Sequence, residues 1–151
     1  IISYLPILLL SKKYKFKLLK LNAFIFKISL LVVLLILLSS DFLIVRIFGQ
    51  EYIESSITTK ILSFSIIFVF YGVVNEHWYI SNNSQKYYGV YVFLGALSNV
   101  FLNFIFITKF GINGAALSTL LTYILIIFCF DNFSKKTKEI FNVKLKSIIT
   151  K

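Results

Sequence analysis

Long apolar stretches without charge alternate with short polar segments along this chain. Residues 87–108 contain no charged side chain, and neither do residues 110–130, so Lys109 alone separates two uncharged stretches. A bilayer core of about 30 Å is crossed by about 20 helical residues, because each residue adds about 1.5 Å along the helix. The pattern therefore predicts a pair of membrane-spanning helices joined by a tight turn.

The same pattern extends over most of the sequence and predicts an all-α protein, a polytopic bundle of transmembrane helices. Backbone amides in hydrocarbon must be bonded internally, which favours helices. The expected full spans cover residues 22–45, 58–80, 87–108 and 113–130. We interpret residues 1–10 as the end of a truncated transmembrane helix, residues 11–21 as a basic cytoplasmic connection and residues 131–151 as a basic cytoplasmic tail.

Composition favours membrane insertion over a soluble fold. Apolar residues make up 58% of the chain, and the mean hydropathy is +0.87. The formal net charge of +10 would suit nucleic acid, but the basic residues lie beside apolar spans. Lipid headgroups are therefore the expected counter-ions, and nucleic acid is not an expected partner. The single cysteine, Cys129, excludes an intrachain disulfide.

Lysines gather in alternate connections between the predicted spans. The segments 11–20, 81–86 and 131–151 hold most of the basic residues, whereas the intervening connections, 46–57 and 109–112, hold few. Basic connections stay on the cytoplasmic side of a membrane. The lysine-rich connections and the carboxy terminus are therefore expected in the cytoplasm, and the other two connections are expected to face outward.

Residues 99–123, NVFLNFIFITKFGINGAALSTLLTY, resemble the penultimate hairpin of the polysaccharide flippases. These proteins form the O-antigen transporter branch of the multidrug/oligosaccharidyl-lipid/polysaccharide exporter superfamily. An Asn, a Leu-Asn pair, an apolar run, Gly-Ile-x-Gly-Ala-Ala and an Ala/Ser-Thr pair recur there in this order. FLIVRIFGQEYIESS at 42–56 resembles the family's outward turn, and SYLPILLLSKK at 3–13 resembles the end of the preceding helix. Thr108 stands where the family often has proline.

The resemblance implies a MATE-like fold, of which this chain supplies the last four spans as a carboxy-terminal fragment. It places the protein in the bacterial cytoplasmic (inner) membrane, with its carboxy terminus in the cytoplasm. Such a flippase carries undecaprenyl-pyrophosphate-linked oligosaccharide, the repeat unit of O-antigen or capsule, by alternating access between two lobes. The implied partners are membrane lipids, the lipid-linked oligosaccharide and the missing amino-terminal lobe of the same protein; no cofactor is expected. A drug or lipid II exporter of the same superfamily is an alternative.

Small and amide side chains repeat at helical spacing in the first span of the hairpin. Gly95, Asn99 and Asn103 follow each other at intervals of four residues and so share a helix face. An unpaired amide in hydrocarbon costs several kcal/mol, so both asparagines are expected to face the protein interior. There they either bond a neighbouring helix or line a substrate cavity.

The turn of the hairpin and the start of its second span are rich in small residues. Gly111 and Asn113 tolerate positive φ, so they are expected to reverse the chain within a few residues. Gly114 then opens the next helix, in which Gly114, Ser118 and Thr122 form one face. Small residues at this spacing allow helices to approach closely.

The second span contains two titratable residues, Glu76 and His77. One interpretation places Glu76 in the bundle interior, as part of a proton or cation pathway. The other places it in an interfacial belt, where Trp78 and Tyr79 lie at the headgroups and Glu76 reaches water. The sequence leaves both interpretations open.

Other charged residues lie inside or beside the spans. Lys27 and Lys60 are the candidates for binding a pyrophosphate from the cavity, although Lys27 also suits snorkelling to the headgroups. Asp41 and Arg46 are expected to form a local ion pair or to be solvated. In the tail, Phe141, Leu145 and Ile148 share a helix face, so the tail either lies on the inner leaflet or is solvated.

Enzymatic chemistry finds little support in this sequence. One histidine and one cysteine offer no metal cluster and no convincing catalytic triad. A membrane enzyme of polysaccharide assembly, such as an O-antigen polymerase, is expected to have a long outward loop with arginine, histidine or acidic residues. Both outward connections here are short. We therefore predict a transport protein, with a truncated, non-functional remnant as the remaining alternative.

Overall fold

The computed structural model describes residues 14–129 and 137–149. All regular secondary structure in these residues is helical, which confirms the all-α class for this part of the chain. The segment 1–10, interpreted as a truncated helix, lies outside the described residues. The elements are α2 (Tyr14–Phe48), η2 (Gln50–Tyr52), α3 (Ser55–Ser63), α4 (Ser65–Ser81), α5 (Gln85–Ile124), the π-helical η3 (Leu125–Cys129) and α6 (Lys138–Ile149).

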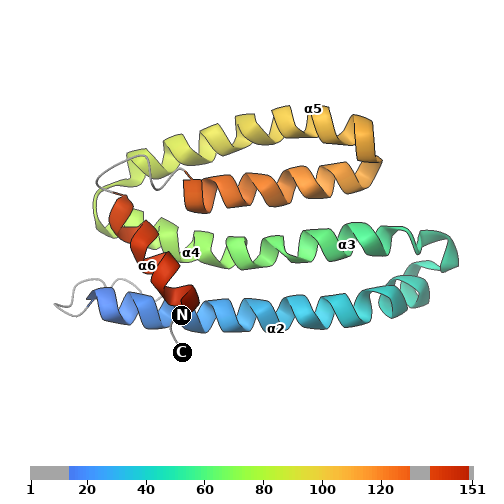
Figure 1. Cartoon of the computed structure of the whole chain (residues 1–151), viewed down its shortest axis with the longest axis horizontal. Helices are drawn as coiled ribbons and strands as arrows, with labels where there is room; N and C mark the ends of the chain where they lie inside the picture. Colours follow the sequence, from blue (N-terminus) through green and yellow to red (C-terminus); the bar gives the residue numbers. More distant parts are fainter. Residues whose placement is uncertain (1–13, 130–136, 150–151) are drawn as a thin grey trace.

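The helix α5 is a hairpin, because the chain reverses at Gly111. This residue has φ 56° and ψ −135°, which lie outside helical values and are accessible mainly to glycine. Figure 1 shows the two halves running back along each other. We call residues 85–110 the outgoing arm and residues 112–124 the returning arm.

The long helices lie side by side (Figure 1). Consecutive segments of the chain run in opposite directions, so α4 and the returning arm, which are neighbours, run the same way. The helices α3 and α4 contact both α2 and α5, and the returning arm lies between α4 and the outgoing arm. Figure 1 is viewed along the shortest dimension of the molecule, so these helices form a flattened arrangement with two broad faces.

Three described helical segments are long and apolar enough to cross a membrane: Phe16–Phe48, Ser55–Ser81 and Gln85–Cys129. The third includes the reversal at Gly111. Large apolar side chains cover the outer surface, with Leu38 74% exposed and Phe104 77% exposed. Such a surface is suited to lipid and unfavourable in water.

Several helix boundaries differ from those expected. Residues 14–21 of the predicted basic connection belong to α2, which also extends past residue 45 to Phe48. Lysine is a good helix former, so a run of lysines does not end a helix. The predicted span 58–80 consists of α3 and α4, which meet at Phe64. Lys109 is helical, and the chain reverses only after it.

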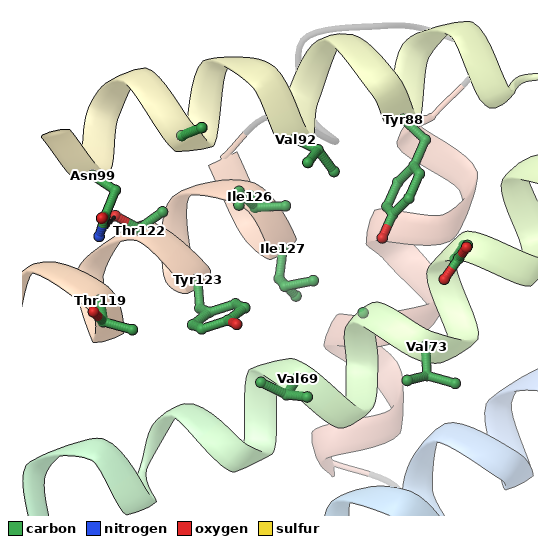
Figure 2. A pocket seen from close by; sticks show the side chains of 13 residues that line it. Val69, Val73, Tyr88, Val92, Asn99, Thr119, Thr122, Tyr123, Ile126 and Ile127 are labelled. Carbon is green, nitrogen blue, oxygen red and sulfur yellow. Dashed lines mark hydrogen bonds between the residues drawn. The ribbon is translucent and has the colours of Figure 1, made fainter. Parts of the chain in front are cut away.

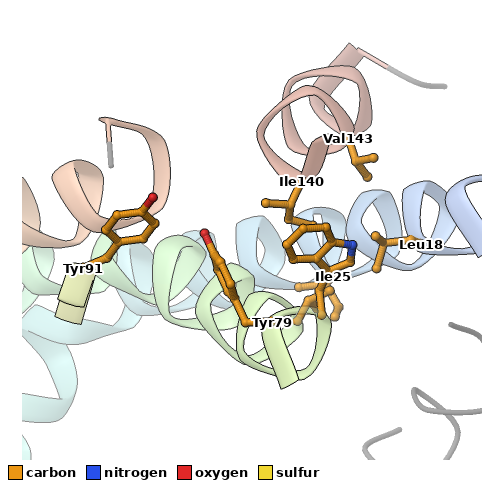
Figure 3. Close-up of a cluster of buried hydrophobic side chains, with 8 residues drawn as sticks. Leu18, Ile25, Tyr79, Tyr91, Ile140 and Val143 are labelled. Atoms are coloured by element: carbon orange, nitrogen blue, oxygen red, sulfur yellow. The ribbon is translucent and has the colours of Figure 1, made fainter. Parts of the chain in front are cut away.

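The core lies at the lysine-rich end of the long helices. Trp78 is 2% exposed and Tyr79 is fully buried, and both pack with Tyr91 and Ile140 in one apolar cluster (Figure 3). Tyr79 contacts Tyr91 with ring centroids 6.2 Å apart. Trp78 and Tyr79 therefore do not form the exposed interfacial belt considered from the sequence; they join α4 to its neighbours.

The helix α6 covers this cluster and crosses α2 and α4 (Figure 1). Its packed side consists of Ile140, Val143, Lys144 and Ser147, each less than a tenth exposed. The apolar residues noted in the sequence, Phe141, Leu145 and Ile148, lie on another side of α6 and are not buried. The tail is therefore helical and docked on the long helices over residues 138–149, rather than fully solvated.

Candidate functional site

A pocket of about 480 Å³ lies between α4 and the two arms of α5. Figure 2 shows α4 contributing Val69 and Val73, the outgoing arm Val92 and the returning arm Thr119. Val73 is 40% exposed and Val92 is 42% exposed, so the pocket reaches the surface of the chain. Its lining consists of Val69, Gly72, Val73, Glu76, Tyr88, Val92, Ala96, Asn99, Thr119, Thr122, Tyr123, Ile126 and Ile127.

One wall of the pocket is a ladder of amide and hydroxyl groups between the arms of α5. Asn99 Nδ2 donates to Thr122 Oγ1 at 3.1 Å, and Asn103 Nδ2 donates to Asn99 Oδ1 at 2.9 Å. The second oxygen of the ladder, Asn103 Oδ1, is buried without a hydrogen-bond partner. The two alternatives raised for Asn99 therefore coexist, because it bonds the neighbouring arm and also lines the pocket.

Gly95 allows the outgoing arm to approach η3 beside this ladder. A Cβ atom at Gly95 would lie 2.3 Å from Ile126 Cδ1, far inside van der Waals contact. Gly95 is buried, and Ile126 lines the pocket. The glycine thus fixes the position of one pocket wall.

Glu76 lies at the pocket, and of the described lining residues it alone is charged. It is exposed on α4, as is Lys27 on α2. Neither Lys27 nor Lys60 belongs to the lining. The structure thus brings Glu76 and Asn99 to one pocket and leaves the two lysines elsewhere. A ligand bound in this pocket would contact one carboxylate and several neutral hydrogen-bond donors and acceptors.

The remaining small residues singled out from the sequence lie at the tip of the hairpin. A Cβ atom at Gly114 would lie 2.0 Å from the backbone oxygen of Phe106, so the arms are in backbone contact there. Ser118 is fully buried and donates to the Gly114 carbonyl at 2.8 Å. Asn113 is helical and does not share the positive φ of Gly111. Its side chain instead accepts a hydrogen bond from Thr58 at 2.6 Å.

A polar cluster joins α2 and α3 at the same end of the molecule as this tip. Lys60 Nζ lies 2.7 Å from Asp41 Oδ1, and Ser56 donates to the same carboxylate. Of the two alternatives considered for Asp41 and Arg46, the ion pair between them is wrong, because Asp41 pairs with Lys60; Arg46 is exposed. Five residues on a helix separate two side chains by about 140°, so Asp41 and Arg46 do not face each other.

Tyr88, Thr119 and Tyr123 are pocket residues that the sequence did not indicate. Tyrosine in a membrane protein is typical of interfaces and of packed surfaces, so its type alone did not distinguish these positions. The one sequence feature that could have indicated Thr119 is its place beside Ser118 and Thr122, which share a helix face.

No metal site is visible within residues 14–129 and 137–149, where no group of three or more His, Cys, Asp or Glu side chains could hold an ion. Comparison with known proteins gives no assignment either. No protein-family model, curated protein or solved structure matches the chain. The interpretation therefore rests on the pocket, the membrane-length helices and the sequence resemblance described above.

Proposed function

We propose that this chain works as part of a flippase that moves undecaprenyl-pyrophosphate-linked oligosaccharide across the bacterial cytoplasmic membrane. The observation that carries the proposal is a pocket with one polar wall and one carboxylate among helices of membrane length. Buried polar groups in membrane helices are costly and usually functional. The resemblance of residues 99–123 to the flippase hairpin supplies the substrate class.

The pocket lining suits the sugar part of such a substrate. Tyr88 and Tyr123 offer aromatic rings, while Asn99, Thr122 and Glu76 offer groups that bond hydroxyls. A pyrophosphate requires cationic or N–H donors, and no lysine or arginine occurs among the described lining residues. In the proposal, basic residues of the other lobe hold the pyrophosphate.

The proposed arrangement has four crossings, because each arm of α5 crosses the membrane separately. The lysine-rich end, with Lys17, Lys20 and Lys86 exposed, lies on the cytoplasmic side. The pocket faces the partner lobe across one broad face of the molecule, and rocking of the two lobes gives access to each side in turn.

Complementation tests this proposal. The complete open reading frame that encodes this chain is expressed in a strain lacking its O-antigen flippase, and surface polysaccharide is measured on stained gels. We expect restored polysaccharide, and a loss of at least tenfold in Asn99→Leu and Glu76→Gln at unchanged protein level. The control is Leu38→Ile, on the exposed side of α2. Wild-type polysaccharide in both pocket variants would refute the role of the pocket.

Residues 1–151 expressed alone provide a second test in the same strain. One lobe lacks the other wall of the cavity, so we expect no polysaccharide at the surface. Restored polysaccharide would contradict the two-lobed mechanism.

A drug exporter of the same superfamily is the second candidate, favoured by the single carboxylate of the pocket. Glu76 without a basic neighbour in the described lining suits an organic cation better than a pyrophosphate. The complete reading frame in an efflux-deficient strain separates the candidates: increased resistance to cationic dyes, lost in Glu76→Gln, would favour the exporter.

A further inference from the structure

The helix α6 has a packed side that fixes its rotation about its own axis. Ser147 Oγ lies 3.0 Å from the Tyr71 hydroxyl, and Lys144 Nζ donates to the Ile127 carbonyl at 2.8 Å. Ile140 and Val143, which precede these two residues in α6, are buried in the core cluster. Contacts with α2, α4 and η3 therefore determine which sides of α6 face away from the protein.

One flank of α6 is apolar and unburied. Successive residues of a helix are about 100° apart, which places Phe141, Leu145 and Ile148 together, roughly a quarter to a third of a turn from the packed side. Leu145 and Ile148 are each 41% exposed. The third side carries Asn142 and Lys146, both exposed. Lys146 is about 100° or more from each residue of the apolar flank. The helix is thus divided into a packed side, an apolar flank and a polar flank.

The helix α6 lies across the long helices, at one of their ends. Figure 1 shows α6 running across α2 and α4 instead of along them. Its contacts lie at the lysine-rich end, beside Leu18 and Trp78. Where the long helices cross a bilayer, a helix that crosses them near one end lies along the membrane surface.

We propose that α6 is an interfacial helix that docks on an anionic phospholipid leaflet. Phe141, Leu145 and Ile148 insert among the upper acyl chains, and the lysines of this end contact the headgroups. Charge complementarity selects anionic lipid, because α6 carries the exposed lysines Lys138 and Lys146, and Lys17, Lys20 and Lys86 are exposed at the same end of the long helices. Basic residues near an anionic surface each strengthen binding, and an amphipathic helix with a basic polar face suits this location. The proposal requires a membrane but not a flippase.

Nanodiscs test the proposal with the whole chain, in a Cys129→Ser background. An environment-sensitive NBD label is placed at Leu145→Cys or, as the matched control, at Lys146→Cys on the exposed polar side. Quenching is measured with spin-labelled phosphatidylglycerol and with spin-labelled phosphatidylcholine. We expect blue-shifted emission and strong quenching at position 145, weak quenching at position 146, and stronger quenching at 145 by the anionic lipid.

Charge variants make the lipid preference specific. Lys138→Gln and Lys146→Gln are each expected to reduce the preference for the anionic lipid at position 145, by up to about fivefold. Lys109→Gln, two residues before the reversal of α5 at Gly111, should leave it unchanged. Equal water exposure at 145 and 146 would overturn the proposal. Blue-shifted emission at position 145 without quenching by either lipid would also overturn it, because protein and not lipid would then cover the apolar flank.

Discussion

Two glycines with different neighbours determine how closely the outgoing arm of α5 approaches the chain after the reversal, at the returning arm and at η3. At Gly114 the neighbour is backbone, since a Cβ atom would lie 2.0 Å from the Phe106 oxygen. Gly114→Ala must therefore shift a helix and is expected to cost about 1 to 3 kcal/mol of unfolding free energy. Thermal unfolding in detergent, followed by circular dichroism, measures the change.

Gly89 provides the matched control, because a Cβ atom there has open space. Gly89→Ala should be neutral or stabilising by up to about 1 kcal/mol, since alanine favours helix more than glycine does. At Gly95 the obstructing atoms belong to the Ile126 side chain, which can change rotamer, so Gly95→Ala should cost less than Gly114→Ala. Equal stability of all three variants would contradict the close packing.

The bond between Asn99 and Thr122 is the second feature to test at residue scale. A double-mutant cycle with Asn99→Ala and Thr122→Val should give a coupling of about 0.6 kcal/mol, and at most about 1.7 kcal/mol, as for other hydrogen bonds in membranes. Unfolding of the four proteins in mixed micelles supplies the energies. Additive single effects would mean that the 3.1 Å contact contributes no stability.

The sequence located this ladder because glycine and asparagine recur at intervals of four. It did not reveal which residues face the pocket from the returning arm. The residues next to Thr119 and Tyr123 in the returning arm are apolar or small. The sequence therefore shows no difference in polarity between the side of this arm that faces the pocket and its other sides.

Between elements, the pair of Asp41 and Lys60 ties α2 to α3. The side chains remain partly exposed, 58% and 32% respectively, so screening by solvent leaves the pair only a small contribution to the unfolding free energy. Asp41→Lys should lose this contribution by juxtaposing two cations, and adding Lys60→Asp should restore it. Chemical denaturation measures the three proteins, and Arg46→Gln is the control. If Arg46→Gln lowered the unfolding free energy as much as Asp41→Lys does, the result would support an ion pair between Asp41 and Arg46 instead.

A second prediction at this scale concerns the attachment of α6. Lys144→Met removes the donor to the Ile127 carbonyl and leaves a buried acceptor without it, at a cost of about 1 to 3 kcal/mol. Faster amide hydrogen exchange over residues 138–149 would report the loosened helix. Asn142→Gln, on the exposed side, should exchange at the wild-type rate; acceleration in both would indicate general unfolding.

The packed side of α6 illustrates what the sequence could not provide. The apolar residues Phe141, Leu145 and Ile148 marked an amphipathic helix, but the buried side includes Lys144 and Ser147. Buried lysine is rare and occurs only with partners. Here the partner is a carbonyl of the π-helix η3, which no local pattern in the tail predicts.

Over the whole molecule, hydropathy located the membrane-length helices but not their packing order. Helices that are apolar on all sides have no distinct inner face, because lipid is as apolar as leucine. The flattened arrangement with α3 and α4 between α2 and α5 therefore comes from the structure alone. The distribution of lysines, in contrast, predicts on which side of the membrane each connection lies.

The proposed four crossings require exposed positions to alternate between the two sides of the membrane. Single cysteines replace Ile53, Lys86, Ile112 and Lys138, all exposed, in a Cys129→Ser background. An impermeant maleimide added to intact cells should label positions 53 and 112, because their connections hold few lysines. Positions 86 and 138 should react only after permeabilisation. Labelling of 86 and 138 from outside would invert the topology, whereas equal reaction of 86 and 112 from one side would show that the outgoing arm does not cross.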